Sequence, residues 1–314
     1  MAEIIKTATR DAYGKALVDL GKINDKIIVL DADLSAATKT GMFKSEYPER
    51  FFNTGIAECN MICIAGGLST LGYTVFASSF AMFTAGRAFE QVRNTLGYPH
   101  LNVKIGATHA GISVGEDGAS HQCCEDIALM RTIPGMVIIN PADDIEARAA
   151  VFAAAAYDGP VYLRFGRLAL PRIFDEDYRF EIGKAVKLCE GKDVTIIATG
   201  LMVSEALAAR EILLTSGISA AVLNIHTIKP IDRDAIISAA KETGAIITSE
   251  EHSIIGGLGG AVAEVVCENF PVPVLRVGVN DVFGRSGPGD EMLHIFGLDA
   301  ANIVEKAKSV CRMK

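Results

Sequence analysis

The nonapeptide 53–61, Asn-Thr-Gly-Ile-Ala-Glu-Cys-Asn-Met, places one carboxylate where a predicted strand gives way to an apolar helix. No residue from Cys59 to Gly86 carries a charge, so Glu58 lies at the mouth of a segment that we expect to be buried. Burial disfavours a charged carboxylate, and a partner facing Glu58 would set its proton affinity. Two roles are open for Glu58: an acid that interacts with the helix dipole, or an acid that exchanges a proton in a site.

A second candidate group lies in the loop 108–122, Thr-His-Ala-Gly-Ile-Ser-Val-Gly-Glu-Asp-Gly-Ala-Ser-His-Gln. The loop joins two histidines, His109 and His121, to two acids, of which Asp117 is one, and to three glycines. It follows a predicted strand, and open α/β sheets bind ligands at the carboxyl ends of their strands. We therefore expect a binding site here, with a solvated glycine-rich loop as the alternative.

The elements that must position these groups follow from hydrophobic periodicity. Strands are predicted at 26–30, 51–52, 74–77, 102–107, 136–140, 160–165, 194–198, 220–225, 245–248 and 274–277. Helices are predicted at 9–20, after residue 58, and at 80–96, 141–157, 202–214, 232–241 and 258–268. The segment 168–178 breaks the pattern and is predicted to be a linker. The fold class is therefore α/β: a doubly wound, mostly parallel sheet over 1–180, followed by a smaller α/β domain over 181–314.

Composition limits the classes of partner. The 314 residues are 50% hydrophobic, enough for two cores, and carry a formal charge of -8. That charge argues against nucleic acid or an anionic membrane as the main partner. Seven cysteines show no zinc or redox spacing, which favours reduced, mostly buried thiols in a cytoplasmic protein.

Three other segments bear on targeting, membranes and phosphate binding. Because the first ten residues are charged at three positions and have no long apolar run, we expect no targeting segment there. Glycine and serine interrupt the uncharged run 59–86, so we expect helix, strand and helix in a core and not a membrane span. The glycines of 256–260 open a predicted helix and could cradle a phosphate, but tight loop-to-helix packing is the preferred interpretation.

In their order and spacing, several motifs resemble the carboxyl-terminal half of transketolase, which is a pyrimidine-binding domain followed by a C-terminal domain. The likeness covers essentially all 314 residues. The motifs are Thr7-Ala8-Thr9-Arg10, Asp31-Ala32-Asp33-Leu34, Gly55-Ile56-Ala57-Glu58, Ala107-Thr108-His109, the segment 115–122, Thr227-Ile228-Lys229-Pro230 and Glu250-Glu251-His252.

The resemblance implies thiamine diphosphate as cofactor. The family's glutamate at the position of Glu58 hydrogen-bonds the aminopyrimidine ring, so the likeness makes Glu58 a cofactor acid. Phe80 and Phe83 match the aromatic residues that stack on that ring, whereas Ala77 stands in the place of a third; simple core packing is the alternative. Asp33 matches an aspartate near the thiazolium ring, with a turn acid as the alternative.

The resemblance also implies a substrate site. His109, His121 and Asp117 match groups that meet the sugar, while Arg10 and Arg164 match those that receive its phosphate. Arginine suits this role because its fork can bind a phosphate in two places.

Two features qualify the phosphate site. Arg167 closely follows Arg164 and could be confused with it in the match. Ala37 stands where transketolases commonly have a serine that assists phosphate binding, which weakens the expected preference for phosphorylated sugars.

A missing motif implies a partner. The family holds the diphosphate through Mg²⁺ and a Gly-Asp-Gly motif, and no such triplet occurs in this sequence. The resemblance therefore implies a separate N-terminal transketolase subunit that holds Mg²⁺, an α2β2 heterotetramer, and transfer of a two-carbon ketol unit between sugar phosphates only in that assembly.

Three rival functions are open. One is the β subunit of a 2-oxoacid dehydrogenase, against which the segment 115–122 argues. Another is half of a 1-deoxyxylulose-5-phosphate synthase, which is normally one chain. The last is a regulatory or scaffolding subunit, which the joint presence of Glu58, His109, Asp117 and His121 disfavours.

Overall fold

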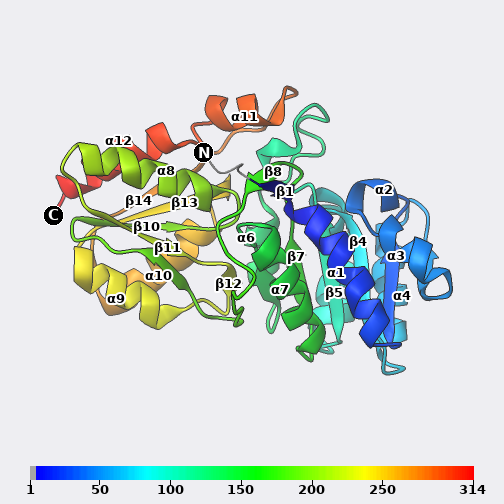
Figure 1. Cartoon of the computed structure of the whole chain (residues 1–314). Helices are drawn as coiled ribbons and strands as arrows, with labels where there is room; N and C mark the ends of the chain where they lie inside the picture. The colour runs from blue at the N-terminus through cyan, green and yellow to red at the C-terminus, as the bar shows by residue number, and fades with distance from the viewer. Residues whose placement is uncertain (1–4) are drawn as a thin grey trace.

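The computed structural model describes residues 5–314. The first four residues belong to the stretch in which no targeting segment was expected, and they lie outside this range. Figure 1 shows two α/β lobes side by side, each built on its own sheet. Among the described helices, none is both long and apolar enough to cross a membrane.

The first lobe contains a sheet in the order β12-β6-β7-β5-β4-β2-β3, parallel except for β12. Besides β12, its strands are β2 (Ile27–Asp31), β3 (Phe51–Asn53), β4 (Thr74–Phe80), β5 (Val103–Thr108), β6 (Val137–Ile139) and β7 (Val161–Arg164). Helices α1 (Thr9–Ile23) and α7 (Asp144–Ala156) pack on one face, and α4 (Glu58–Ser69) and α6 (Asp126–Arg131) on the other. The predicted doubly wound, mostly parallel sheet is confirmed.

The continuous apolar strands reflect burial on both faces of this sheet. Val29 and Phe76 pack in the core under α1 and α7, whereas their neighbours Leu30 and Val75 pack in the core under α4. Successive side chains of a strand point to opposite faces, so a strand covered on both sides must be apolar throughout.

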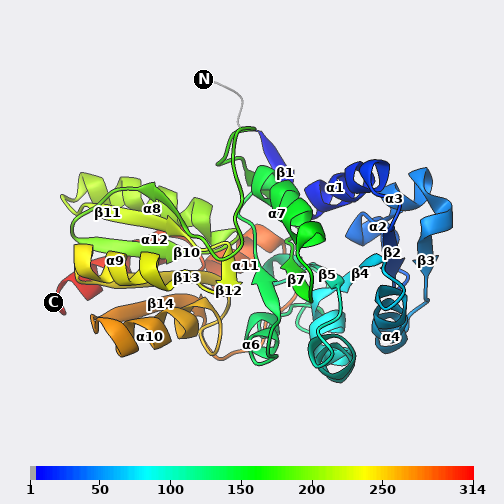
Figure 2. The ribbon, with the colours of Figure 1, turned by 90° about the horizontal axis from the view of Figure 1, so that it is seen from below.

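The second lobe has a sheet in the order β14-β13-β10-β11-β9. Its strands are β9 (Val186–Cys189), which is antiparallel, and the parallel β10 (Val194–Ala198), β11 (Ala220–Asn224), β13 (Ile246–Ser253) and β14 (Val274–Val279). Helices α8 (Met202–Thr215) and α12 (Ala300–Cys311) cover one face, and α9 (Arg233–Thr243) and α10 (Leu258–Asn269) the other, as Figure 2 shows. Strand β9, helix α12 and the short helix α11 (Gly289–Ile295) were not predicted.

One strand crosses between the lobes. β12 (Thr227–Lys229) comes from the second half of the chain but pairs antiparallel with β6 at the edge of the first sheet. Lys229 fastens it further, because its Nζ donates to the carbonyl oxygens of Arg131 and Ile133 at 2.8 and 2.6 Å. The domain boundary at 180/181 stays a prediction.

Two sequence expectations need correction. The predicted helix at 80–96 starts later, because β4 continues to pair with β5 as far as Phe80 opposite Thr108, and wide helical turns follow over 82–97. The predicted linker 168–178 contains a strand, β8 (Ala169–Pro171), which pairs with β1 (Lys6–Ala8).

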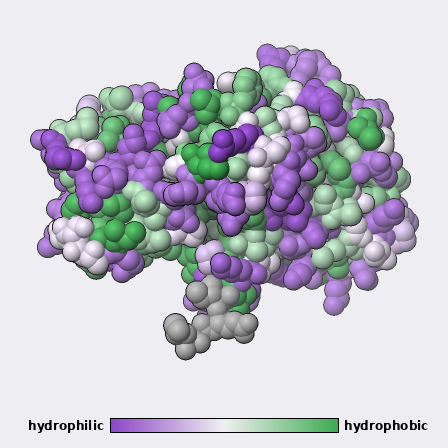
Figure 3. All heavy atoms as spheres, turned by 90° about the horizontal axis from the view of Figure 1, so that it is seen from above, coloured by the Kyte–Doolittle hydropathy of each residue, from purple (hydrophilic) through white to green (hydrophobic). Residues whose placement is uncertain are grey.

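The cysteines also differ from expectation. All seven are free, but only Cys123 is buried, while Cys63 and Cys267 are exposed and the other four are half-buried. Apolar sequence neighbours did not reveal which helix face is covered. The face drawn in Figure 3 mixes hydrophilic and hydrophobic residues in small groups.

Candidate active site

Glu58 is the first residue of α4, and its side chain is 1% exposed. The partner that its burial requires is Arg87, whose Nη1 donates to Oε2 at 2.8 Å. The sequence predicted a partner without identifying it. Arg87 is the first charged residue after the uncharged run, and this position was the available signal.

The rest of α4 is less buried than predicted. Cys63 and Ile64 are exposed on the helix, as are Phe52 and Ile56 on the segment that leads into it. The absence of charge therefore does not mean burial here. An uncharged, partly apolar surface lies next to the buried carboxylate.

Aromatic rings form the middle of the site. Phe80, at the end of β4, lies parallel to Phe83 with centroids 5.8 Å apart and stacks on the His109 ring at 3.9 Å. The edge of His121 meets Phe83 at 5.3 Å. Arg87 lies over the Phe83 ring, with its guanidinium carbon 4.6 Å from the ring centroid.

His109 follows β5 and adopts a positive φ of 57°. Arg10 Nη1 lies 2.8 Å from its Nε2, and Thr108 Oγ1 lies 2.9 Å from its Nδ1. Because arginine can only donate, Nε2 must accept, and Nδ1 carries the proton and donates it to Thr108. Burial, helped by the charge of Arg10, lowers the pKa of His109 to about 3, so the imidazole is neutral near pH 7.

Arg10 is the cation beside this histidine. Its Nη1 also donates to Ala37 O at 3.2 Å, whereas its buried Nε has no hydrogen-bond partner within residues 5–314. Burial lowers the pKa of Arg10, and the nearby charge of Arg167 adds to this effect. An unpaired buried N–H on a cation suits an anionic ligand.

Arg167 lies in the same region, since its charge also lowers the pKa of His109. Its Nη1 donates to Glu116 Oε2 at 2.7 Å and to the carbonyl of Val114, so it holds the loop 108–122. Of the two nearby arginines in the sequence, Arg167 is therefore the one that contacts the loop through its side chain and lowers the pKa of His109.

Arg164 occupies a different environment. It is 3% exposed, and its Nε donates to Asp126 Oδ2 at 2.8 Å. Its Nη2 donates to Glu251 O at 2.9 Å and Cys123 O at 3.4 Å. Although burial opposes it, Asp126 and Glu251 raise the pKa of Arg164. This geometry argues against the phosphate role predicted for Arg164, because partners within the fold already bind its guanidinium.

The remaining predicted residues lie nearer the surface. His121 is half-buried, with Nδ1 2.9 Å from Ser120 Oγ, and Asp117 is exposed on the same loop. Asp33 is exposed at a positive φ of 67° and accepts a hydrogen bond from Asn53 Nδ2 at 2.8 Å. These contacts fit a turn acid at Asp33 and leave the Asp117 carboxylate open to a ligand.

The side chains of this site fit the aminopyrimidine half of thiamine diphosphate, the cofactor that the resemblance implies. A buried carboxyl beside parallel aromatic rings suits an aminopyrimidine: Glu58 would meet a ring nitrogen, and Phe80 and Phe83 would meet the ring face. For the diphosphate half, residues 5–314 contain no group of three or more His, Cys, Asp or Glu side chains that could hold a metal ion.

The glycine cluster is packed and does not form a phosphate cradle. Glu250 fills it, accepting hydrogen bonds from the backbone N–H of Leu258 at 2.6 Å and of Gly259 at 2.8 Å. A Cβ at Gly257 would collide with Glu250 Oε2, so only glycine fits there. Tight packing, the preferred interpretation, agrees with these contacts.

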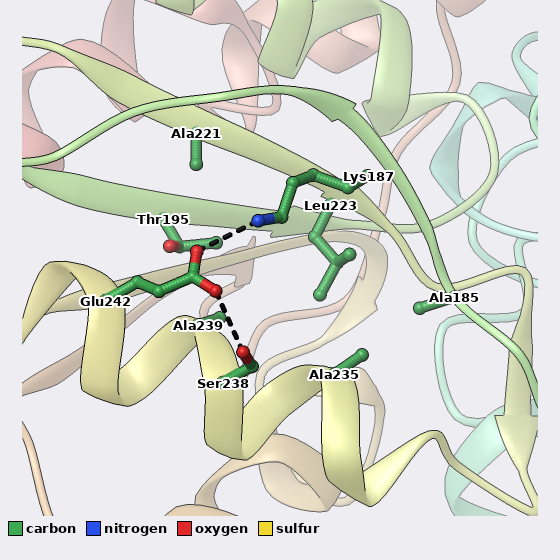
Figure 4. A pocket seen from close by; sticks show the side chains of 9 residues that line it. All are labelled: Ala185, Lys187, Thr195, Ala221, Leu223, Ala235, Ser238, Ala239 and Glu242. Carbon is green, nitrogen blue, oxygen red and sulfur yellow. Dashed lines mark hydrogen bonds and ion pairs between the residues drawn. The ribbon is translucent and has the colours of Figure 1, made fainter.

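Two pockets lie outside this group of residues. One of about 440 Å³ adjoins Ser120 and Gln122 and extends to Phe283 of the second lobe. The other, of about 190 Å³, lies between β11 and α9 and is drawn in Figure 4. There Glu242 accepts from Lys187 at 2.9 Å and from Ser238 at 2.8 Å over a floor of small side chains. No predicted site residue lines either pocket.

Comparison with known proteins gives matches over most of the chain. Residues 5–172 match the model of the transketolase pyrimidine binding domain, and residues 183–303 that of the transketolase C-terminal domain. A Methanocaldococcus jannaschii chain provisionally named a transketolase C-terminal section is 55% identical over 300 residues, covering 95% of this chain and 94% of that one.

Two other relatives are similar over nearly their full length. The 6-deoxy-6-sulfo-D-fructose transketolase subunit SqwH of Clostridium sp. (strain MSTE9) is 45% identical and covers 97% of this chain and 95% of its own. A solved structure described as a split gene transketolase, inactive beta4 tetramer, has a TM-score of 0.92 at 54% identity and covers 98% and 99% of the two chains.

Proposed function

The chain belongs to the transketolase family and corresponds to its C-terminal section, and from this we propose that it is one subunit of a split, thiamine diphosphate-dependent transketolase. In this proposal it transfers a two-carbon ketol unit between sugar phosphates only with an N-terminal partner. The family membership comes from the matches above, whereas the substrate, the partner and the residue roles belong to the proposal.

One observation carries the proposal: an unbroken row of contacts joins Glu58 to Arg10. The row begins with the ion pair to Arg87 and continues through the rings of Phe83 and Phe80 to His109. His121 touches the same rings. An acid, a flat aromatic surface, neutral imidazole and an arginine thus follow one another in the order that a cofactor and a phosphorylated substrate would need.

The chain's own residues have separable roles in this proposal. When bound, thiamine diphosphate supplies the carbon nucleophile of the reaction. Glu58 would share a proton with the pyrimidine nitrogen, and Phe80 and Phe83 would orient the ring. Neutral His109, whose ring nitrogens are engaged by Arg10 and Thr108, would hold Arg10 in place beside the substrate without adding charge.

The outer part of the site would meet the sugar and its phosphate. His121 and Asp117, on one glycine-containing loop, would bind sugar hydroxyls. Arg10, with its unpaired buried N–H, would bind the phosphate together with Arg167, which replaces Arg164 in this role. Ala37 contributes only its carbonyl, which orients Arg10.

The partner would complete the cofactor site. The sequence lacks a Gly-Asp-Gly motif, which supports a separate N-terminal subunit that holds the diphosphate and Mg²⁺. The relatives named above that have similarly short chains support the same division, and the inactivity described for the beta4 tetramer agrees with it. We place the α2β2 assembly in the cytoplasm.

The test is reconstitution. The chain is used to capture its partner from the source cell, and ketol transfer is measured for each subunit alone and for the mixture, with thiamine diphosphate and Mg²⁺. We expect activity in the mixture only, and a captured chain that contains the diphosphate motif. Normal activity of the isolated chain would overturn the split site, and release of CO2 or of deoxyxylulose phosphate by the mixture would assign a rival function.

A further inference from the structure

The second lobe holds the loop that carries His121 and Asp117. Gln122, at the end of this loop, donates through Nε2 to Arg285 O at 2.9 Å. Ser253 N donates to Cys124 O at 2.7 Å just beyond it. The loop therefore lies between the two lobes and is fastened to the second one at its C-terminal end.

Glu251 makes the contact at the loop's other end. It lies on β13 of the second sheet, 3% exposed, and its Oε1 accepts from Ser113 N at 2.7 Å. The carboxyl also lies against Gly111, where a Cβ would collide with Glu251 Cδ. Gly111 has a φ of 82°, so both its backbone conformation and the close carboxyl require glycine.

Arg164 fixes the position of Glu251 in turn. Its Nη2 donates to Glu251 O at 2.9 Å, while its Nε is held by Asp126 Oδ2 at 2.8 Å. Asp126 is fully buried in the first lobe. The backbone carbonyl of Glu251 is thus bound to β7 and its side chain to the loop.

We propose that Glu251 is a positioning residue: Arg164 anchors its backbone carbonyl, and its carboxyl holds the backbone at Ser113 so that His121 and Asp117 stay directed at the substrate. This inference rests on the proposed function, because it assigns that site a residue from the second lobe. Glu251 touches no predicted substrate group, and it acts only through the loop.

Glu250 provides a matched control. It is the neighbouring residue on β13, similarly buried, and its carboxyl also accepts backbone N–H groups. Those groups belong to Leu258 and Gly259 of α10, within the second lobe. A loss of general stability would affect both variants, whereas a loss of loop positioning would affect only Glu251.

The first test measures amide hydrogen exchange in the isolated full chain, so it does not depend on activity. In Glu251→Ala we expect exchange at Ser113 to rise about tenfold to a hundredfold, since a hydrogen bond to a charged group is lost. Glu250→Ala should instead loosen Leu258 and Gly259. Unchanged exchange at Ser113 in Glu251→Ala, or an equal rise there in Glu250→Ala, would overturn the proposal.

A milder variant covers the case in which Glu251→Ala does not fold. Glu251→Asp keeps the charge but withdraws the carboxyl by one methylene, and we expect exchange at Ser113 to rise while the strands of both sheets stay protected. Glu251→Gln keeps an acceptor oxygen and should restore protection. Protection at Ser113 that is the same for Asp, Gln and Glu would contradict the role of the carboxyl.

The second test uses the reconstituted complex. Glu251→Ala should lower kcat/KM for the sugar donor at least about tenfold and leave exchange at C2 of bound thiamine diphosphate near wild type, with rescue by Glu251→Gln. A wild-type complex without ketol transfer would defeat the proposed function, while the exchange experiment would still decide the role of Glu251. Equal loss of kcat/KM in Glu250→Ala would defeat positioning.

Discussion

Replacement of Asp126 by asparagine removes one charge from the buried pair with Arg164. Asp126 is fully buried and Arg164 is 3% exposed, with a donor–acceptor distance of 2.8 Å. At that distance two unit charges attract by about 6 kcal/mol with an effective dielectric constant of about 20. Asparagine keeps the volume and can still accept a hydrogen bond from Arg164 or from Tyr162, so part of this interaction survives.

The expected loss in the free energy of unfolding is therefore about 3–5 kcal/mol, the range typical of a buried cation left without its partner. The matched control is Asp19→Asn, whose partner Arg148 lies at a similar distance of 3.1 Å but with both side chains about half exposed. Water and salt screen that pair, so its loss should cost less than about 1 kcal/mol.

Urea unfolding of the isolated chain, followed by circular dichroism, measures both variants against the wild type. Should Asp126→Asn and Asp19→Asn differ by less than about 1 kcal/mol, the assignment of Arg164 to a stabilising network would be refuted. Its phosphate role would then have to be reconsidered. Hydrogen exchange at Cys124 and Ser253 would show whether the lobe junction has opened.

Three further predictions address the site and the pH dependence. Glu58→Gln should slow deuterium exchange at C2 of thiamine diphosphate in the reconstituted complex and keep the fold, because glutamine cannot supply a titratable proton; equally fast exchange would reject Glu58 as the cofactor acid. Arg10→Ala should lower kcat/KM for a phosphorylated ketose by the equivalent of about 2–3 kcal/mol and scarcely change kcat/KM for an unphosphorylated one. Equal losses for the two substrates would speak against a phosphate contact. Burial raises the pKa of Glu146 from 4.5 to about 7, so the fold favours its neutral form; the free energy of unfolding should fall as pH rises through that interval, and less so in Glu146→Gln. Urea unfolding at several pH values measures how the free energy of unfolding changes with pH in the wild type and in Glu146→Gln. An identical pH dependence in the two proteins would contradict this prediction.

The strands and the sheet class could be predicted because burial on both faces leaves a direct record in sequence. A short, continuous apolar run such as residues 27–30 is typical of a parallel strand that helices cover on both sides. β12 could not be predicted, since three residues carry no period and its partner β6 lies far upstream. The hydrophobic pattern of a segment indicates how its two faces are buried, but not which strand pairs with it.

For the candidate site, the sequence indicated which residues to consider but not how their side chains contact one another. Phe80 ends β4 and His109 directly follows the adjacent parallel strand β5, so their meeting follows from the sheet. The pair of Glu58 with Arg87 depends on how wide turns orient one side chain, which periodicity does not encode. Arg164 and Arg167 are three residues apart in the sequence. Arg164 is the last residue of β7 and pairs with Asp126 in the interior, whereas Arg167 lies beyond the strand and pairs with Glu116 on the loop 108–122.

The crossing strand β12 limits where this chain can be cut. A shortened protein ending at residue 180 would lose the three residues that pair with β6, together with the Lys229 contacts to Arg131 and Ile133. β6 would then become a bare, apolar sheet edge, a surface on which other chains can add strands. A proteolytic nick in the segment between the sheets would not release two independent bodies either. Recombination that exchanges only one of the lobes would consequently have to carry residues 227–229 along with the first.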